Sequence, residues 1–156
     1  VISMINNKKL DNNKYIIQEK IKGKEISVDC WSSENNNRIS TLMRERNKIK
    51  NGESEISIFF KNKKIENQII KIIKKLKISG IFNIQGFILK NKFYIFDINP
   101  RVGGSMAFSY FKGLNFIMLS LSEHLNLKKL NFKLKKNKNN IFYKSNKVYS
   151  LSDNSI

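Results

Sequence analysis

Two apolar runs, residues 81–89 and 93–98, are separated only by Lys90, Asn91 and Lys92. Runs of this length, rich in Ile and Phe and joined by a short polar link, are typical of the two strands of a β-hairpin. The second run has apolar side chains at successive positions, which predicts a central strand covered on both faces. We therefore expect this hairpin in the middle of a sheet.

Two stretches have the apolar periodicity of helices. One is a stripe over residues 65–76, made of Ile65, Ile69, Ile72, Ile73 and Leu76. The other lies over residues 114–125, made of Leu114, Ile117, Met118, Leu121 and Leu125. Before the first helix, strand-like runs are punctuated by turn signals at residues 35–37 and 51–52. The pattern predicts an α+β fold, a mostly antiparallel sheet with both helices packed on it.

The chain is strongly basic, with a net charge of +18, and 26 of its 30 positive residues are Lys. Lys, Ile and Asn, whose codons are rich in A and T, occupy 72 of the 156 positions. A bias in the base composition of the gene therefore explains much of the lysine excess. A basic surface can bind phosphate polymers. Here, however, the lysines are scattered from Lys8 to Lys147 and not clustered with Arg and exposed aromatic residues. A solvated surface is therefore favoured over a nucleic-acid-binding protein.

The length fits one domain with one real core. A single cysteine, Cys30, allows no internal disulfide, which favours a reducing compartment. Cys30 lies beside Trp31 and is expected to be a small buried apolar group rather than a nucleophile.

No signal peptide or long apolar run is found, so no membrane partner is expected and a cytoplasmic location is predicted.

Polar residues interrupt the apolar pattern at Asp97, Asn99 and Arg101. On a strand, Asp97 and Asn99 project from the same face, and an odd-numbered hairpin loop would place Gln85 opposite Asp97. Oxygen ligands in small number suit Mg²⁺, which shares its remaining positions with phosphates. An adjacent Arg can hold phosphate oxygens. The alternative is a polar turn that ends the strand at Pro100, and spacing alone leaves both possibilities open.

Three segments together resemble the ATP-grasp superfamily, and most closely its carbamoyl-phosphate-synthase large-subunit type. Residues 80–85, Gly-Ile-Phe-Asn-Ile-Gln, followed by residues 96–105, Phe-Asp-Ile-Asn-Pro-Arg-Val-Gly-Gly-Ser, resemble its metal and phosphate end. Residues 16–29, Ile-Ile-Gln-Glu-Lys-Ile-Lys-Gly-Lys-Glu-Ile-Ser-Val-Asp, resemble its hinge strand. A weaker match joins residues 44–46 with residues 52–54. The matches occur in family order, which is more specific than any one of them.

The resemblance implies a nucleotide site. Glu19 and the backbone around Ile21 would border adenine, and Glu25 would accept hydrogen bonds from the ribose hydroxyls. Arg46 and Lys50 fall in a region on the phosphate side.

The resemblance also implies a metal site. Gln85, Asp97 and Asn99 would bind one or two Mg²⁺ (or Mn²⁺) ions, and Arg101 would neutralise phosphoryl charge. The family usually has Glu where this sequence has Asp97, and the shorter side chain is less able to bridge two ions.

The activity implied by the resemblance is ATP-dependent ligation of a carboxylate to an amine or similar nucleophile through an acyl phosphate. No glycine-rich loop precedes Tyr15, so the resemblance implies the C-terminal half of such an enzyme, which is split, truncated or partial. If the enzyme is split, a separate N-terminal half is expected as a partner, besides ATP and the two substrates. The expected organisation is a remnant over residues 1–14, a nucleotide- and metal-binding portion over residues 15–127, and a Lys/Asn-rich tail, possibly a hairpin, over residues 128–156. A non-catalytic nucleotide-binding module is the alternative.

Overall fold

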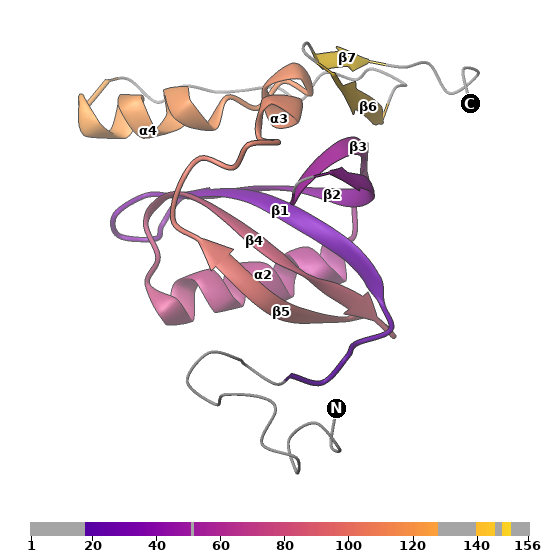
Figure 1. Cartoon of the computed structure of the whole chain (residues 1–156). Helices are drawn as coiled ribbons and strands as arrows, with labels where there is room; N and C mark the ends of the chain where they lie inside the picture. Colours follow the sequence, from indigo (N-terminus) through magenta and orange to yellow (C-terminus); the bar gives the residue numbers. More distant parts are fainter. Residues whose placement is uncertain (1–17, 51, 128–139, 146–147, 151–156) are drawn as a thin grey trace, which may run out of the picture.

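The structure, a computed structural model, describes residues 18–50, 52–127, 140–145 and 148–150 (Figure 1). The predicted N-terminal remnant and most of the predicted tail lie outside the described residues. The strands and helices follow in the order β1 (Lys24–Ser32), β2 (Ile39–Lys50), β3 (Glu53–Phe59), α2 (Lys63–Leu76), β4 (Gly80–Leu89), β5 (Lys92–Asn99), α3 (Ala107–Phe111), α4 (Phe116–His124), β6 (Ile141–Lys144) and β7 (Val148–Ser150).

The strands form one sheet in the order β5-β4-β1-β2-β3-β6-β7, in which each neighbouring pair is antiparallel. The predicted α+β class is therefore confirmed.

The predicted central position of residues 93–98 is wrong, because β5 is the edge strand in the described part of the chain. Tyr94 and Phe96 are 38% and 40% exposed. The run is apolar on both faces for another reason: one face packs on α2 and the other lines a cavity.

Helix α2 covers one face of the sheet, as Figure 1 shows. Its buried residues Ile65, Ile69 and Ile73 confirm most of the predicted stripe and pack on apolar side chains from β1, β2 and β4. Leu76, the last residue of the predicted stripe, is 53% exposed. The helix begins where the Asn62 side chain accepts a hydrogen bond from the backbone N–H of Ile65. On β1 every second residue, Ile26, Val28 and Cys30, is fully buried in this core. The residues between them face the other side of the sheet.

A second core lies at one end of that other face, where α3 and α4 cover the sheet (Figure 1). It is made of Trp31, Leu42, Phe59, Met106, Phe108, Phe116, Leu119 and Phe142. The helix predicted in this region is present, but most of its predicted stripe is wrong, because α4 buries Phe116, Leu119 and Ser122 instead. Of the predicted stripe, Leu114 alone packs against this core.

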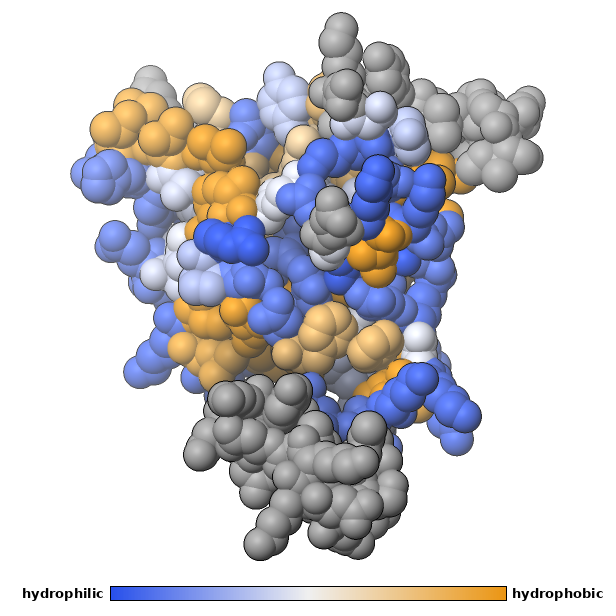
Figure 2. All heavy atoms as spheres, viewed as in Figure 1, coloured by the Kyte–Doolittle hydropathy of each residue, from blue (hydrophilic) through white to orange (hydrophobic). Residues whose placement is uncertain are grey.

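The predicted α4 stripe lies on the surface: Ile117, Met118, Leu121 and Leu125 are between 39% and 58% exposed. Figure 2 shows the resulting apolar area over α4. An apolar cavity of about 570 Å³ lies between this surface and α3. In the described part of the chain, no helix has the length and hydropathy needed to cross a membrane.

Candidate functional site

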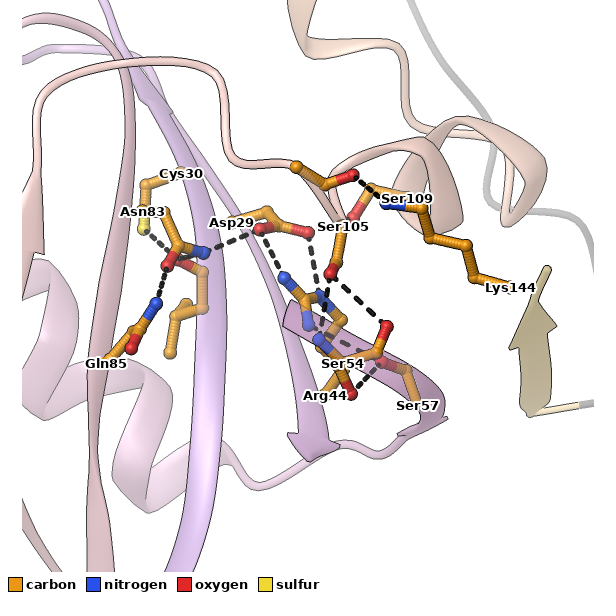
Figure 3. A network of polar contacts seen from close by, with 12 residues as sticks. Asp29, Cys30, Arg44, Ser54, Ser57, Asn83, Gln85, Ser105, Ser109 and Lys144 are labelled. Atoms are coloured by element: carbon orange, nitrogen blue, oxygen red, sulfur yellow. Dashed lines mark hydrogen bonds and ion pairs between the residues drawn. The ribbon is translucent and has the colours of Figure 1, made fainter. Parts of the chain in front are cut away.

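The face of the sheet opposite α2 carries a continuous set of polar side chains beyond the second core. These come from β1, β2, β4 and β5, and comprise Glu25, Ser27, Asp29, Arg44, Arg46, Asn83, Gln85, Asp97 and Asn99. The register explains why they share a face. Ser27 pairs with both Arg44 and Gln85, while Gln85 also pairs with Asp97 and Asn83 pairs with Asn99. Part of this set is drawn in Figure 3.

A β-bulge in β5 aligns Gln85 with Asp97. The hairpin loop has two residues, Lys90 and Asn91, which both have positive φ angles of 47° and 61°. The predicted condition of an odd-numbered loop is therefore wrong, and this loop alone would pair Gln85 with Phe96. The register instead shifts by one residue between Gln85 and Gly86, which leaves Phe96 unpaired and restores the predicted Gln85–Asp97 pair.

Gly86 is needed opposite the bulge. A Cβ added there would lie 2.4 Å from the carbonyl oxygen of Tyr94 and 2.6 Å from the ring of Phe93. Because the nearer atom belongs to the backbone, a side chain at this position would push β5 away from β4. The close approach of the two strands thus depends on a residue without a side chain.

The three predicted metal ligands lie together at the end of the β4–β5 pair. Gln85 faces Asp97 across the strands, and Asn99 Nδ2 donates a 2.6 Å hydrogen bond to Asp97 Oδ2. One carboxylate and two amide groups form a hard oxygen set, which fits Mg²⁺ or Mn²⁺ completed by water and phosphate oxygens. No group of three or more His, Cys, Asp and Glu side chains that could hold a metal occurs among the described residues. A cation here would therefore depend on the one carboxylate of Asp97, on the two amide oxygens and on ligand oxygens.

Arg46 links the predicted ribose residue to the predicted metal ligands. Its Nη1 donates to Glu25 Oε1 at 2.6 Å and to Gln85 Oε1 at 2.9 Å. Its Nη2 donates to the backbone oxygen of Gly52 at 2.6 Å. The Arg46 side chain is only 6% exposed, so a positive charge is held between two acceptors on this face. Such a group can bind an anion or the phosphate end of a nucleotide.

Beside Glu25 lies a cavity of about 390 Å³. It brings together the three residues predicted to border adenine and ribose, Glu19, Ile21 and Glu25. The remaining lining residues are Gln18, Phe87, Tyr94, Ile95 and Phe96. The rings of Phe87 and Phe96 lie 5.2 Å apart between centroids. Apolar and aromatic walls with a few polar groups at the rim are typical of pockets for small planar ligands.

Two predicted site residues are not brought into the cluster. Lys50 lies at the end of β2, where its side chain is 72% exposed and its Nζ is 4.0 Å from Glu55 Oε1. Arg101 follows β5 and is exposed, and its Nη1 donates to the backbone oxygen of Val102 at 3.2 Å. The long side chain of each can reorient in solvent, but the structure gives neither a contact with the predicted metal ligands.

The sequence analysis missed a buried polar network beneath the site. Asp29 forms an ion pair with Arg44, with 3.1 Å between Arg44 Nε and Asp29 Oδ2. It also accepts hydrogen bonds from Ser109 at 2.6 Å and from Asn83 at 2.7 Å (Figure 3). A signal existed in the sequence, because Glu25, Ser27 and Asp29 alternate with core residues at the spacing of one strand face.

Comparison with known proteins matches the chain to one family and its fold to several solved structures. A family model described as "ATP-grasp in the biosynthetic pathway with Ter operon" matches residues 11–146. Biotin carboxylase from Campylobacter jejuni, solved as a β,γ-ATP complex, superposes with a TM-score of 0.62 at 14% identity, over 80% of this chain and 30% of that one.

Two further structures support the same fold. The phosphoribosylaminoimidazole carboxylase ATPase subunit from Aquifex aeolicus gives a TM-score of 0.59 at 20% identity, over 72% of this chain and 36% of that one. N5-carboxyaminoimidazole synthetase from Staphylococcus aureus, complexed with ADP, gives 0.56 at 23% identity, over 71% and 32%. The chain thus spans about a third of the length of these proteins. None of them is of the carbamoyl-phosphate-synthase type.

Proposed function

This chain belongs to the ATP-grasp family, and we propose that it binds ATP and a divalent cation on the polar face of its sheet as part of a carboxylate ligase. The observation that carries the proposal is the position of Arg46. This residue contacts Glu25 at the rim of the cavity and Gln85 next to Asp97. One nucleotide can therefore span the cavity, the Glu25 carboxylate and the oxygen set of β4 and β5.

At the base end, the cavity would hold adenine between Ile21 and the aromatic wall made by Phe87 and Phe96. Glu19 would lie at the amino edge of the base, and Glu25 would accept hydrogen bonds from the ribose hydroxyls. These are charge-assisted contacts, which are stronger than hydrogen bonds between neutral groups. Since Glu25 is already held by Arg46 at 2.6 Å, it is oriented before a ligand arrives.

At the phosphate end, Gln85, Asp97 and Asn99 would hold the cation, which supplies charge neutralisation for the phosphate oxygens. Arg46 would neutralise charge from the sheet side of the nucleotide. Arg101 and Lys50 would be recruited from solvent as the phosphates bind, since both are exposed in the structure. This chain's residues thus orient the phosphates and neutralise their charge, which is the main protein contribution to phosphoryl transfer.

The reaction we propose is ligation of carbamoyl-phosphate-synthase type. The γ-phosphoryl group moves from ATP to a carboxylate oxygen, and ADP is released. The nitrogen of an amine or similar nucleophile then attacks the acyl phosphate carbon and phosphate leaves.

We further propose that turnover needs a lid subdomain in addition to the nucleotide and metal portion described here, since the chain spans about a third of its structural relatives. The chain alone would then bind ATP weakly and release no ADP with any carboxylate. ADP formation by the purified chain would contradict this requirement. A chain that binds ATP but stays inactive when the lid subdomain is supplied would be a non-catalytic module.

The nucleotide site can be tested by NMR titration of the chain with Mg-ATP up to millimolar concentration. We expect shifts at residues around the cavity, and weaker binding in Glu25→Gln by about 1.5–3 kcal/mol, the range for a hydrogen bond to a charged group. Glu45→Gln is the matched control, because Glu45 pairs with Lys24 outside the polar face. Equal affinity of wild type and Glu25→Gln would show that Glu25 does not bind ribose.

A further inference from the structure

A row of side-chain hydrogen bonds crosses the sheet from the buried network to the candidate metal position. Asn83 Nδ2 donates to Asp29 Oδ1 at 2.7 Å. Gln85 Nε2 donates to Asn83 Oδ1 at 3.3 Å, as Figure 3 shows. Gln85 Oε1 in turn accepts from Arg46 Nη1 at 2.9 Å. All four side chains come from neighbouring strands on one face.

The chemistry of the two ends gives this row a direction. A carboxylate only accepts hydrogen bonds and a guanidinium only donates them, whereas an amide group has one end of each kind. With Asp29 at one end and Arg46 at the other, only one orientation of the two amides satisfies every group. The backbone oxygen of Val28 accepts a second hydrogen bond from Asn83 Nδ2 at 3.2 Å, which favours the same orientation.

The Asp29 end is rigid. Asp29 is fully buried, and its two oxygens are also held by Arg44 and by the hydroxyl of Ser109. Turning the Asn83 amide around would direct its oxygen at this carboxylate and at the Val28 carbonyl. Both contacts would be repulsive in a site from which water is excluded.

We infer that Asn83, held by Asp29, is a positioning residue that binds the NH₂ group of Gln85 and so leaves the carbonyl oxygen, which now accepts from Arg46, as the end of the amide that can bind a cation. The inference rests on the proposed function, in which a cation binds at Gln85 Oε1. Arg46 would be repelled by that cation, so the Asp29 end alone would then keep the Gln85 amide in place. Without Asn83, the Gln85 side chain would present its NH₂ group to the cation in part of the population.

The test compares Asn83→Ala with Ser109→Ala in the full chain. Both variants remove a buried hydrogen bond to Asp29, but only the first breaks the row that reaches Gln85. Asn83→Ser, which retains a polar side chain too short to bridge both partners, serves if Asn83→Ala does not fold.

The first readout needs no ligand. In wild type, only one of the two Gln85 side-chain amide protons bonds to Asn83 Oδ1. The NMR shifts of the two protons should therefore differ from those of a free glutamine amide, whose protons are already inequivalent because its C–N bond does not rotate freely. Both shifts should move to the free-glutamine values in Asn83→Ala and keep the wild-type values in Ser109→Ala. Wild-type shifts in Asn83→Ala, or free-glutamine shifts in both variants, would overturn the inference.

The second readout is Mn²⁺ binding in the presence of a non-hydrolysable ATP analogue, followed by electron paramagnetic resonance. Loss of a residue that orients a metal ligand is expected to weaken metal binding by about 10- to 100-fold. Ser109→Ala should stay within about twofold of wild type. Equal Mn²⁺ affinity in Asn83→Ala and wild type would overturn the inference. If wild type binds no Mn²⁺ with the analogue, the proposed function fails, and the amide shifts still decide how Gln85 is oriented.

Discussion

Gln85 lies directly opposite Asp97 because β5 carries one extra residue, Phe96, between two stretches of regular pairing with β4. The extra residue does two things at once. It places Asp97 on the same face as Gln85, and it puts the Phe96 ring beside Phe87 in the wall of the neighbouring cavity. The bulge therefore joins the candidate base pocket to the candidate metal position.

Substitution of Gly86 tests this dependence on the bulge. Gly86→Ala should lower the free energy of unfolding by about 1–3 kcal/mol, the usual cost of overpacking, because the added Cβ meets the Tyr94 backbone oxygen at 2.4 Å. Gly103→Ala is the control, since its Cβ would have no neighbour closer than 3.6 Å. Denaturant unfolding measures both. Equal stabilities of the two variants would show that β5 can move away from β4 without cost.

The buried Asp29–Arg44 pair is predicted to be the most costly ion pair to break. Arg44→Met should destabilise the chain by about 3–5 kcal/mol, because it leaves a fully buried carboxylate without its cation. Lys48→Met, which removes the 2.9 Å surface pair with Glu55, should leave the unfolding midpoint unchanged. A similar midpoint for both variants in urea would contradict the role given to Arg44.

Cys30 should not react with thiol reagents in the native protein. Burial, and to a lesser extent the neighbouring Asp29, raise the pKa of its thiol well above the ordinary value of 9.0. Since the thiolate is the reactive form, the group stays protonated and inaccessible at pH 8. An aromatic disulfide reagent should therefore modify Cys30 only after guanidinium is added. Rapid modification of the native chain at pH 8 would mean that the core around β1 opens readily.

Most of the fold could be predicted from local patterns. The Ile65, Ile69 and Ile73 stripe and the two runs of the β4–β5 hairpin follow from periodicity, which depends on near neighbours only. The edge position of β5 could not be predicted, because the sequence of an apolar strand that lines a cavity resembles that of a strand covered by core. The prediction of which face of α4 is buried was also wrong. The most regular apolar stripe of this helix is exposed, whereas the shorter set of Phe116, Leu119 and Ser122 is buried.

Only those residues of the candidate site that follow from strand geometry or from the family resemblance could be predicted. The spacing of Asp97 and Asn99 and the hinge-strand resemblance at Glu25 identified side chains that the structure places on one face. The bond from Ser109 to Asp29 could not be predicted, because it links α3 to β1 across 80 positions. Asp29 itself was missed although its alternation with core residues along β1 was visible in the sequence. Lys50 and Arg101 were predicted from their positions along the chain, but such a position does not determine where a long exposed side chain points.

The most direct test of nucleotide and metal binding is a thermal melt of wild type and Asp97→Asn, with and without Mg-ATP. The substitution removes the carboxylate from the proposed ligand set but keeps an oxygen that can accept the hydrogen bond from Asn99. We predict that wild type is stabilised by Mg-ATP. For Asp97→Asn we predict an unchanged or slightly higher melting temperature without ligand, and no stabilisation by Mg-ATP. A lower melting temperature without ligand and an unchanged shift with Mg-ATP would show that Asp97 serves the turn and not the site.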